Sequence, residues 1–265
     1  EWFRWKYANN PAGPPHIYFA EDAESKSLAG IYCIIPWDLV SQGKVFTCAQ
    51  SVDTMIHPQY RGQGIVEVLS RFMFEDLKST QVTALFGFPN EKFFPITIKI
   101  GWNHLGTMLT YVKPLAVEML MGSRILPWPI PQLVNRFLKG IDNALYLISN
   151  RGYELHEVYG FGAFDETGLH GHGAIGTKRS AGYLTWRYTE KPGVYYRIHC
   201  LKKEGREHCW IISKEDYKEI VILDILPVLE EAVVSALLLF SAIMRREGKY
   251  GIRISCHGPI CRQIK

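Results

Sequence analysis

The stretch that decides the fold reads Asp53-Thr54-Met55-Ile56-His57-Pro58-Gln59-Tyr60-Arg61-Gly62-Gln63-Gly64. An apolar segment typical of a strand, Lys44 to Met55, leads into it, and an amphipathic helical segment, Gly64 to Ser79, follows it. A glycine-containing turn between a strand and a helix places several backbone N–H groups without intrahelical partners around one point. The pattern therefore predicts a phosphate-binding turn, because the helix N-terminus also carries about half a positive charge.

The glycines and the arginine of this turn have separate expected roles. A side chain at Gly62 or Gly64 would block close approach of the main chain to a pyrophosphate, and Arg61 is expected to pair with an outer phosphate. A dinucleotide-binding fold would need G-x-G-x-x-G near the chain start, and a P-loop would need G-K-[ST]; the sequence has no G-x-G-x-x-G near its start and no G-K-[ST]. An ordinary glycine turn before a helix stays open as the alternative.

The stretch resembles the acyl-CoA-binding motif of the GNAT (Gcn5-related N-acetyltransferase) superfamily, in its form x-V/I-x-P-x-Y-R-G-x-G. A second block agrees, since Asn90 follows Phe88-Pro89 and stands eleven residues before Gly101-Trp102, a spacing similar to that of many members. The resemblance extends over residues 1 to about 114. It implies that the strands before and after the motif splay apart and that the pantetheine arm lies between them.

The resemblance also implies the co-substrate and its contacts. Acetyl-CoA or another short acyl-CoA would be bound by main-chain groups at the strand end, by the amides of the glycine turn and by the Asn90 side chain. The cofactor-binding residues implied in this way are Met55, Ile56, Arg61, Gly62, Gln63, Gly64, Ile65 and Asn90.

In the superfamily's usual mechanism an amine attacks the thioester carbonyl, so a group that removes a proton and one that supplies a proton are needed. Many members place a tyrosine seven residues after the asparagine; here that position is Thr97. The catalytic candidates are Asp53, Gln50 acting through a bound water, and His57. Burial in an apolar strand is expected to raise the pKa of Asp53. Two non-catalytic roles stay open as alternatives. Asp53 would be a carboxylate satisfied by hydrogen bonds from its neighbours, and His57 would be an exposed turn residue.

A degenerate internal repeat organises the chain. The pattern W-[KR]-Y-x-x-x-P occurs at Trp5 and again at Trp186. Each copy is followed by three strands, a helix and a further strand. The expected elements are strands 17–21, 28–35, 44–55 and 82–88 with helices 64–79 and 91–100 in the first copy, then strands 194–201, 208–213, 219–226 and 250–256 with helix 228–246 in the second.

The repeat predicts an α/β fold with two tandem GNAT-like domains, each a mixed sheet flanked by helices. The expected boundaries are 1–114 for the acyl-CoA-binding domain, 115–152 for a helical connector and 153–265 for the degenerate copy. A closing strand or hairpin, His104 to Tyr111, is expected in the first domain, which we expect to lack its opening strand and helix. In the second copy, Leu226 to Glu231 carries two carboxylates and no glycine, so we predict one CoA per chain.

Composition limits the other function classes. The formal net charge is +4 and the basic residues form no stripe, which argues against a nucleic-acid partner. The longest apolar run, Val233 to Met244, is shorter than the ~20 residues of a membrane span. Six cysteines without a C-x-x-C pair indicate buried free thiols and a cytoplasmic protein. We expect no metal site, because His156, His170 and His172 have no evident third ligand.

These observations and the resemblance predict an enzyme, an acyl-CoA-dependent N-acyltransferase that modifies an amino group of a small polar acceptor. The repeated W-[KR]-Y arrangement also resembles bacterial tandem-GNAT proteins, some of which acylate amino groups of nucleotide-linked sugars, and this resemblance implies a nucleotide-linked amino sugar as the acceptor. The alternative is a catalytically weak or inactive CoA-binding regulatory module, which the threonine at position 97 favours. Transfer of aminoacyl groups from tRNA is disfavoured by the absence of a basic stripe and by the intact phosphate turn. A homodimer formed through exposed sheet edges is compatible with the pattern.

Overall fold

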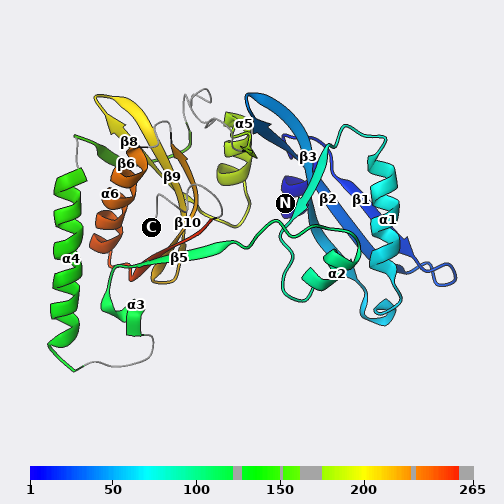
Figure 1. The fold of residues 1–265 in the computed structure, drawn as a ribbon, viewed down its shortest axis with the longest axis horizontal. Coiled ribbons are helices and arrows are strands. Elements are labelled where there is room, and N and C mark those ends of the chain that lie inside the picture. The colour runs from blue at the N-terminus through cyan, green and yellow to red at the C-terminus, as the bar shows by residue number, and fades with distance from the viewer. Residues whose placement is uncertain (122–126, 150–151, 162–174, 228–230, 257–265) are drawn as a thin grey trace. The chain divides into compact units, whose positions relative to one another are not determined.

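The computed structural model describes residues 1–121, 127–149, 152–161, 175–227 and 231–256. Two compact units divide the chain. Unit 1 comprises Glu1–Leu105 and His170–Gly193, and unit 2 comprises Gly106–Leu169 and Val194–Lys265. Each unit contains one mixed β-sheet flanked by helices (Figure 1), which confirms the predicted fold class.

The sheet of unit 1 has the strand order β1-β2-β3-β4, with β7 paired to β2. The first three strands are antiparallel neighbours, whereas β4 runs parallel to β3. The strands are β1 (His16–Glu21), β2 (Leu28–Ser41), β3 (Lys44–Ile56), β4 (Ala84–Gly87) and β7 (Gly176–Thr177). The helical segments are η1 (Arg4–Ala8), η2 (Pro58–Tyr60), α1 (Ile65–Leu77), α2 (Phe94–Lys99), α5 (Ala181–Leu184) and η4 (Thr185–Thr189).

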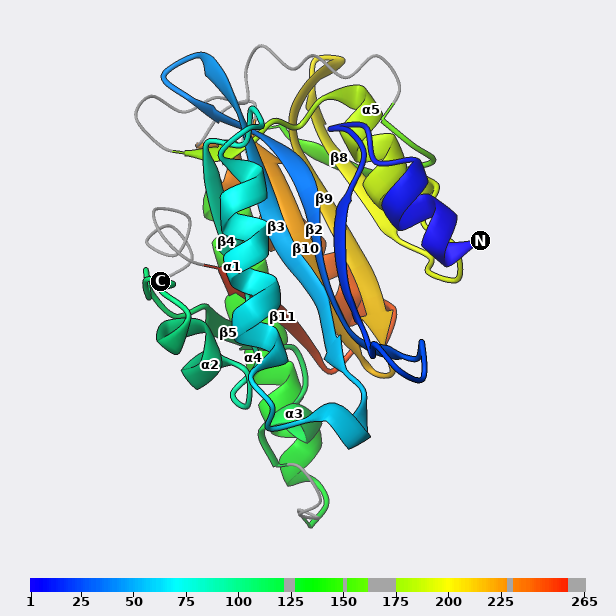
Figure 2. The ribbon, with the colours of Figure 1, turned by 90° about the vertical axis from the view of Figure 1, so that its right-hand side faces the viewer.

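Helix α1 lies across one face of this sheet (Figure 2), and the two bury a shared apolar core. Leu69 and Met73 of α1 pack with Tyr32 and Ile34 of β2. On the strands, successive side chains point to opposite faces, so Cys33 and Ile35 of β2 form a second cluster with Tyr7 of η1. The sheet of unit 1 is therefore covered on both faces.

The sheet of unit 2 has the order β5-β11-β10-β9-β8-β6 and repeats the plan of unit 1. Strands β8, β9 and β10 are antiparallel neighbours, and β11 is parallel to β10. The strands are β5 (Leu109–Pro114), β6 (Glu154–Val158), β8 (Arg197–Lys203), β9 (Arg206–Asp216), β10 (Glu219–Pro227) and β11 (Gly251–Cys256). The helices are α3 (Val117–Met121), α4 (Ile130–Ser149) and α6 (Ala232–Arg246).

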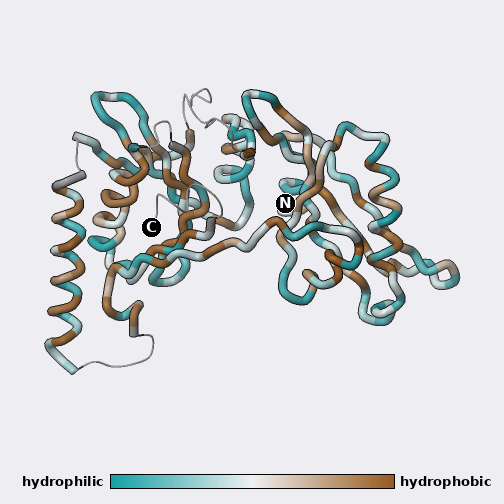
Figure 3. Tube along the Cα trace, viewed as in Figure 1, coloured by the Kyte–Doolittle hydropathy of each residue, from teal (hydrophilic) through white to brown (hydrophobic). Residues whose placement is uncertain are grey.

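Helix α6 provides much of the core of unit 2. Its residues Phe240 and Met244 are fully buried with Ile211 of β9 and Ile220 of β10. Hydrophobic segments of the central strands and α6 accordingly lie side by side in Figure 3. Helix α4, which lies in the expected helical connector at 115–152, packs on α6 within the same unit.

The strand expected to close the first sheet belongs to the second one. The prediction placed it at 104–111, but β5 comprises Leu109–Pro114 and pairs antiparallel with β11, from Leu109 opposite Cys256 to Pro114 opposite Gly251. Strand β4 is consequently an edge of the sheet that the structure describes in unit 1. The limits of the two compact units differ from the predicted domain boundaries 1–114, 115–152 and 153–265. Those boundaries describe the sequence repeats and stay a prediction.

Several compositional expectations can be compared with the described residues. Cys33, Cys48, Cys200 and Cys209 are buried free thiols, as expected. None of the described helices combines the length and apolarity needed to cross a membrane. His170 and His172 lie outside the described residues, and within those residues no group of three His, Cys, Asp or Glu could hold a metal.

Candidate functional site

The turn between β3 and α1 has the backbone conformation that its glycines allow. Gly62 and Gly64 have φ values of 78° and 75°, in the left-handed region that favours glycine. Helix α1 begins at Ile65, and the Val68 N–H donates to the Gly64 carbonyl at 3.1 Å. The first amides of the helix precede this bond and lack intrahelical acceptors. The turn thus has the geometry of an anion-binding helix N-terminus.

An open strand edge adjoins this turn. Strands β3 and β4 pair over four positions, from Cys48 opposite Ala84 to Ser51 opposite Gly87. Strand β3 then continues to Ile56 without a paired residue of β4. Within the described residues, the main chain of 52–56 therefore lacks a strand partner on this side. This is the divergence of two parallel strands that the sequence resemblance implied.

Arg61 and Asn90 stand near the two ends of the open edge. The exposed Arg61 side chain donates from Nε to the Ile56 carbonyl at 3.2 Å, which holds the guanidinium beside the end of β3. Asn90 follows β4, and its Oδ1 accepts from the Phe93 N–H at 2.9 Å, so it caps the start of α2. An amide with Oδ1 engaged in this way keeps the two N–H donors of Nδ2 for a ligand.

Glu67 and Lys99 are two charged residues that the sequence reasoning missed. Glu67 lies in the first turn of α1, and its carboxylate accepts from Lys99 Nζ of α2 at 2.8 Å. The hydrogen bond from Lys99, helped by the Glu67 backbone amide, lowers the pKa of Glu67. A Cβ on Gly64 would lie 3.9 Å from this carboxylate. The sequence signal was an acidic residue three positions after the second glycine.

Asp53 is held by two side chains from the first W-K-Y block. Its Oδ2 accepts from Lys6 Nζ at 2.5 Å and from the Tyr7 hydroxyl. Burial raises the pKa of Asp53, but the hydrogen bonds from Lys6 and Tyr7 and the charge of Lys6 outweigh it, so the net pKa lies below the usual value. The expectation of a raised pKa was therefore wrong, because strand burial was considered without the buried cation. The signal for Lys6 was present in the repeat motif.

The other proposed proton-handling residues lie apart, Gln50 within β3 and His57 beyond its end. Gln50 pairs with Ile35, so its side chain shares the face of the cluster of Tyr7, Cys33 and Ile35. His57 is exposed beyond the strand end, with its ring 5.8 Å from that of Tyr60. The structure places Gln50 with Asp53 near the start of the open edge and His57 next to the glycine turn.

Thr97, at the position where a tyrosine was expected, is buried in α2. Its hydroxyl donates to the Phe94 carbonyl at 2.7 Å, an arrangement that satisfies the side chain within its own helix. The hydroxyl is therefore committed to the helix backbone.

The two W-[KR]-Y blocks pack against each other within unit 1. The rings of Trp5 and Trp186 stack with centroids 5.1 Å apart. Each indole Nε1 donates to the other residue's carbonyl, at 2.6 Å from Trp5 and 2.8 Å from Trp186. The repeated motif thus forms a reciprocal, buried contact.

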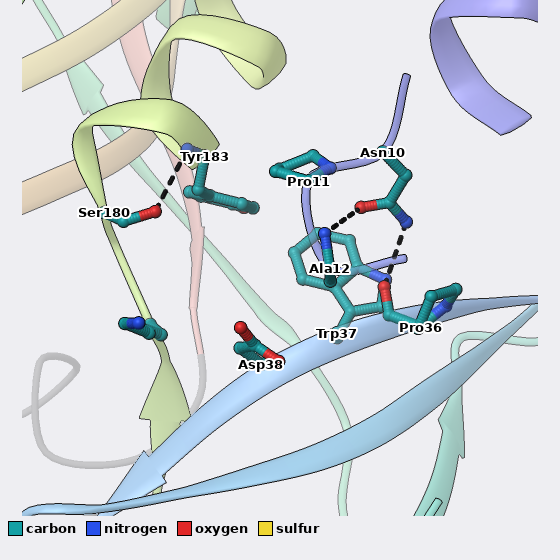
Figure 4. A pocket seen from close by; sticks show the side chains of 9 residues that line it. Asn10, Pro11, Ala12, Pro36, Trp37, Asp38, Ser180 and Tyr183 are labelled. Atoms are coloured by element: carbon teal, nitrogen blue, oxygen red, sulfur yellow. Dashed lines mark hydrogen bonds between the residues drawn. The ribbon is translucent and has the colours of Figure 1, made fainter. Parts of the chain in front are cut away.

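A small cavity lies beside this contact, between the loop after η1, β2 and α5 (Figure 4). Asn10 spans one side, accepting from the Ala12 N–H and donating to the Pro36 carbonyl, both at 3.0 Å. The cavity has a volume of about 30 Å³, which suits a water molecule and is too small for an acceptor substrate. Unlike the open edge of β3, it is therefore no candidate for substrate binding.

Comparison with known proteins agrees with this geometry. Residues 1–105 match the family model described as an acetyltransferase (GNAT) domain. No protein of curated function matches the chain in sequence.

Solved structures share the fold across nearly the whole chain. A GCN5-related N-acetyltransferase from Anabaena variabilis has a TM-score of 0.59 at 14% identity, covering 88% of this chain and 54% of its own. A probable N-acyltransferase from Enterococcus faecalis has a TM-score of 0.53 at 13% identity, covering 90% and 55%. Saccharomyces cerevisiae N-myristoyltransferase with bound myristoyl-CoA has a TM-score of 0.54 at 10% identity, covering 96% and 63%.

The chain thus spans between half and two thirds of the length of these structures, and at such identities the likeness concerns the fold. The family match covers the β3–α1 turn, the open edge of β3 and Asn90. Residues 1–105 of this chain are therefore similar to the GNAT acetyltransferase domain family.

Proposed function

We propose that this protein is an N-acyltransferase that moves an acetyl or other short acyl group from CoA to an amino group of a small polar acceptor. The observation that carries the proposal is the continuity of two features: the unpaired edge of β3 over 52–56 and the glycine turn that follows it. An extended pantetheine arm needs main-chain partners along its length, and a pyrophosphate needs convergent N–H donors. Along the chain, the open edge of β3 would contact the pantetheine arm and the glycine turn that follows it would contact the pyrophosphate, which is the order of these groups in CoA.

The binding residues follow from this arrangement. Main-chain groups of Met55 and Ile56 would bind the pantetheine, and Asn90 Nδ2 would meet it from the β4 side. The pyrophosphate would be bound by the turn amides, with Arg61 pairing to an outer oxygen. The turn amides are those of Gly62, Gln63, Gly64 and Ile65.

In the proposed reaction, the amine nitrogen attacks the thioester carbonyl carbon, the C–S bond breaks and the released thiolate takes a proton, while the new amide nitrogen loses one. Gln50 and Asp53 lie on the same face near the start of the open edge. Asp53 is ionised because of Lys6 and Tyr7, so it suits electrostatic binding of an ammonium group, and a water bound by Gln50 would accept the proton. His57, beside the glycine turn, is the weakest candidate.

The acceptor that we propose is an amino sugar linked to a nucleotide. This proposal rests on the sequence resemblance of the repeated W-[KR]-Y arrangement to bacterial tandem-GNAT proteins, some of which acylate such sugars. A panel of amines, in which nucleotide-linked amino sugars are compared with free amino sugars and with simple alkylamines, would test it. Cytoplasmic location and homodimerisation stay predictions.

A calorimetric titration of acetyl-CoA tests the binding part. The wild type should bind saturably at one site, and Gly64→Glu should lose binding because the new carboxylate stands at the pyrophosphate and beside Glu67. Gly205→Glu is a matched control, since Gly205 also has a φ of 75° and has open space around it. Absence of binding by the wild type, or equal binding by Gly64→Glu, would contradict the proposal.

A CoA-binding module without catalysis is the second candidate, and the committed hydroxyl of Thr97 favours it. Turnover decides between the two. We expect Asp53→Asn to lower turnover while CoA still binds. If the wild type binds CoA but transfers no acyl group to any amine of the panel, the regulatory role is the better description.

A further inference from the structure

Asp53 occupies a strained β-bulge. Its φ is 45°, a left-handed value, and the β2–β3 register shifts here: Val52 lies opposite Cys33 and Met55 opposite Ile31. Asp53 and Thr54 together therefore stand opposite a single residue of β2. Left-handed backbone is uncommon at residues other than glycine, and inside a strand it needs neighbouring groups that hold it.

The surroundings that hold the bulge come from η1. Lys6 and Tyr7 both donate to Asp53 Oδ2, and their side chains are largely withdrawn from solvent, Lys6 with 13% of its surface exposed. Lys6 Nζ also lies 4.8 Å from the Trp2 ring centroid. The bulge is thus held by a partly buried ion pair and by the hydrogen bond from a phenol, both of which are charge-assisted.

η1 is itself fixed by the second repeat block. Trp5 precedes Lys6 directly, and it is anchored to Trp186 through the stacked rings and the two reciprocal indole bonds. Rotation of η1 would break both bonds. The second W-[KR]-Y block therefore supports the contact between the first block and Asp53.

The bulge lies where β3 and β4 separate. The last β3–β4 pair joins Ser51 to Gly87, two residues before Asp53. The direction of the main chain after the bulge decides which backbone N–H groups face the open edge. A shift of about 1 Å in such a group is enough to reduce a rate strongly.

We propose that Lys6 and Tyr7 are positioning residues for acyl transfer, acting through the Asp53 bulge, and that Trp186 supports them. The three residues set the orientation of the main-chain groups at the inner end of the open edge, where the thioester carbonyl would lie. This inference rests on the proposed acyl-CoA function and adds a role for the repeated motif.

The test compares CoA with acetyl-CoA in Lys6→Met and Tyr7→Phe, which are mild changes that keep most of the side-chain volume. Both variants should bind CoA within about twofold of the wild type, because the pyrophosphate and pantetheine contacts lie elsewhere. They should lose any preference of the wild type for acetyl-CoA over CoA. Their kcat for release of CoA thiol should fall about 10- to 100-fold, with little change in KM for acetyl-CoA.

Two control variants distinguish a specific effect on the Asp53 bulge from a general loss of stability. Tyr18→Phe removes a similar phenol–carboxylate bond, from Tyr18 to Asp76 at 2.8 Å, on the α1 side of the sheet. Lys78→Met removes an exposed ion pair with Glu75. Neither control should change kcat or the ratio of the two affinities.

The outcomes are distinguishable. A wild type that binds neither CoA nor acetyl-CoA overturns the acyl-transfer function and this inference with it. A wild type that binds and turns over, with Lys6→Met and Tyr7→Phe unchanged in kcat, overturns the inference alone. The same holds if Tyr18→Phe lowers kcat as much as Tyr7→Phe.

Discussion

The strand–helix junctions of the two units follow one plan but differ at the turn. In both units, the pairing of two parallel strands stops before the strand that leads to the helix ends. The last pair is Ser51 with Gly87 in unit 1 and Ile222 with Ile254 in unit 2. Unit 1 then has two left-handed glycines before α1. Unit 2 has Glu231 at the start of α6, and residues 228–230 of this junction lie outside the described chain. The same fold can therefore be kept while the chemistry of the turn changes.

The two helices differ in how fully they are buried. In α6 the residues Ala236, Phe240 and Met244 have no exposed surface, whereas in α1 Val68 and Phe72 are more than 60% exposed. Burial of this kind stabilises a domain by roughly 2 kcal/mol for each large apolar side chain. Apolar packing therefore stabilises unit 2, whereas the left-handed glycines of the turn and the polar contacts of Asp53 hold the site in unit 1.

The number of CoA sites per chain tests whether the two junctions differ in CoA binding. Wild-type protein should bind one CoA per chain, and Gly64→Glu should weaken that site by more than about 100-fold, because it places a carboxylate against the pyrophosphate. Isothermal titration measures both values. A second site in the wild type would mean that unit 2 also binds CoA, whereas a single site of unchanged affinity in Gly64→Glu would mean that the glycine turn of unit 1 does not bind it.

Arg197 tests the structural character of unit 2. It is 9% exposed and bonds to both carboxylate oxygens of Glu157 and of Glu247, at 2.5 to 2.9 Å. Arg197→Met leaves these acids without their partner and should lower the free energy of unfolding by about 3 kcal/mol. Urea denaturation measures the loss. Lys78→Met, at an exposed pair, should cost under about 0.5 kcal/mol, and neither change should alter CoA affinity.

His199 gives unit 2 a pH dependence of its own. It is 1% exposed, and burial lowers its pKa to about 4, so the folded state keeps it neutral. The unfolded chain takes up a proton below about pH 6.5, so stability is present above that pH and is lost as pH falls toward 4, by about 3 kcal/mol in total. Denaturation at pH 7 and pH 5 should show the decline, and His199→Leu should flatten it.

The pKa values of Glu157 and Glu247 are lowered as well, first by their hydrogen bonds to Arg197. Their contribution is present above the unfolded glutamate pKa of about 4.3 and is lost below it as the folded pKa values are passed. Their window therefore lies below that of His199. An unchanged slope in His199→Leu between pH 7 and pH 5 would contradict the assignment to His199.

Arg61 tests how much side-chain charge adds to the phosphate binding of the glycine turn. Arg61→Ala should weaken acetyl-CoA binding about three- to tenfold, since an exposed charge-assisted contact contributes modestly. Arg136→Ala, at an exposed residue of α4, is the control and should leave the affinity unchanged. A loss in Arg61→Ala that does not shrink with added salt would indicate a role other than phosphate pairing.

Sequence patterns located most elements because the patterns are local. Strand β3 was expected at 44–55 and lies at Lys44–Ile56, and the helix expected at 64–79 is α1, Ile65–Leu77. Strand β2 continues six residues beyond its predicted end at Ile35, since Pro36 and Trp37 still pair with Ala49 and Cys48. Hydrogen bonding to a neighbouring strand can therefore make a strand longer than the alternation of apolar residues in its own sequence predicts.

The glycine turn, the repeat and the family resemblance can be read from the amino-acid order, because each is carried by short local motifs. The folded chain was needed to show that β5 pairs with β11, that Lys6 and Tyr7 meet Asp53 from 46 or more residues away, and that Trp186 anchors Trp5. Such contacts depend on which surfaces the whole chain buries together. For the same reason, the direction of the pKa shift of Asp53 was set by a distant cation rather than by its own strand.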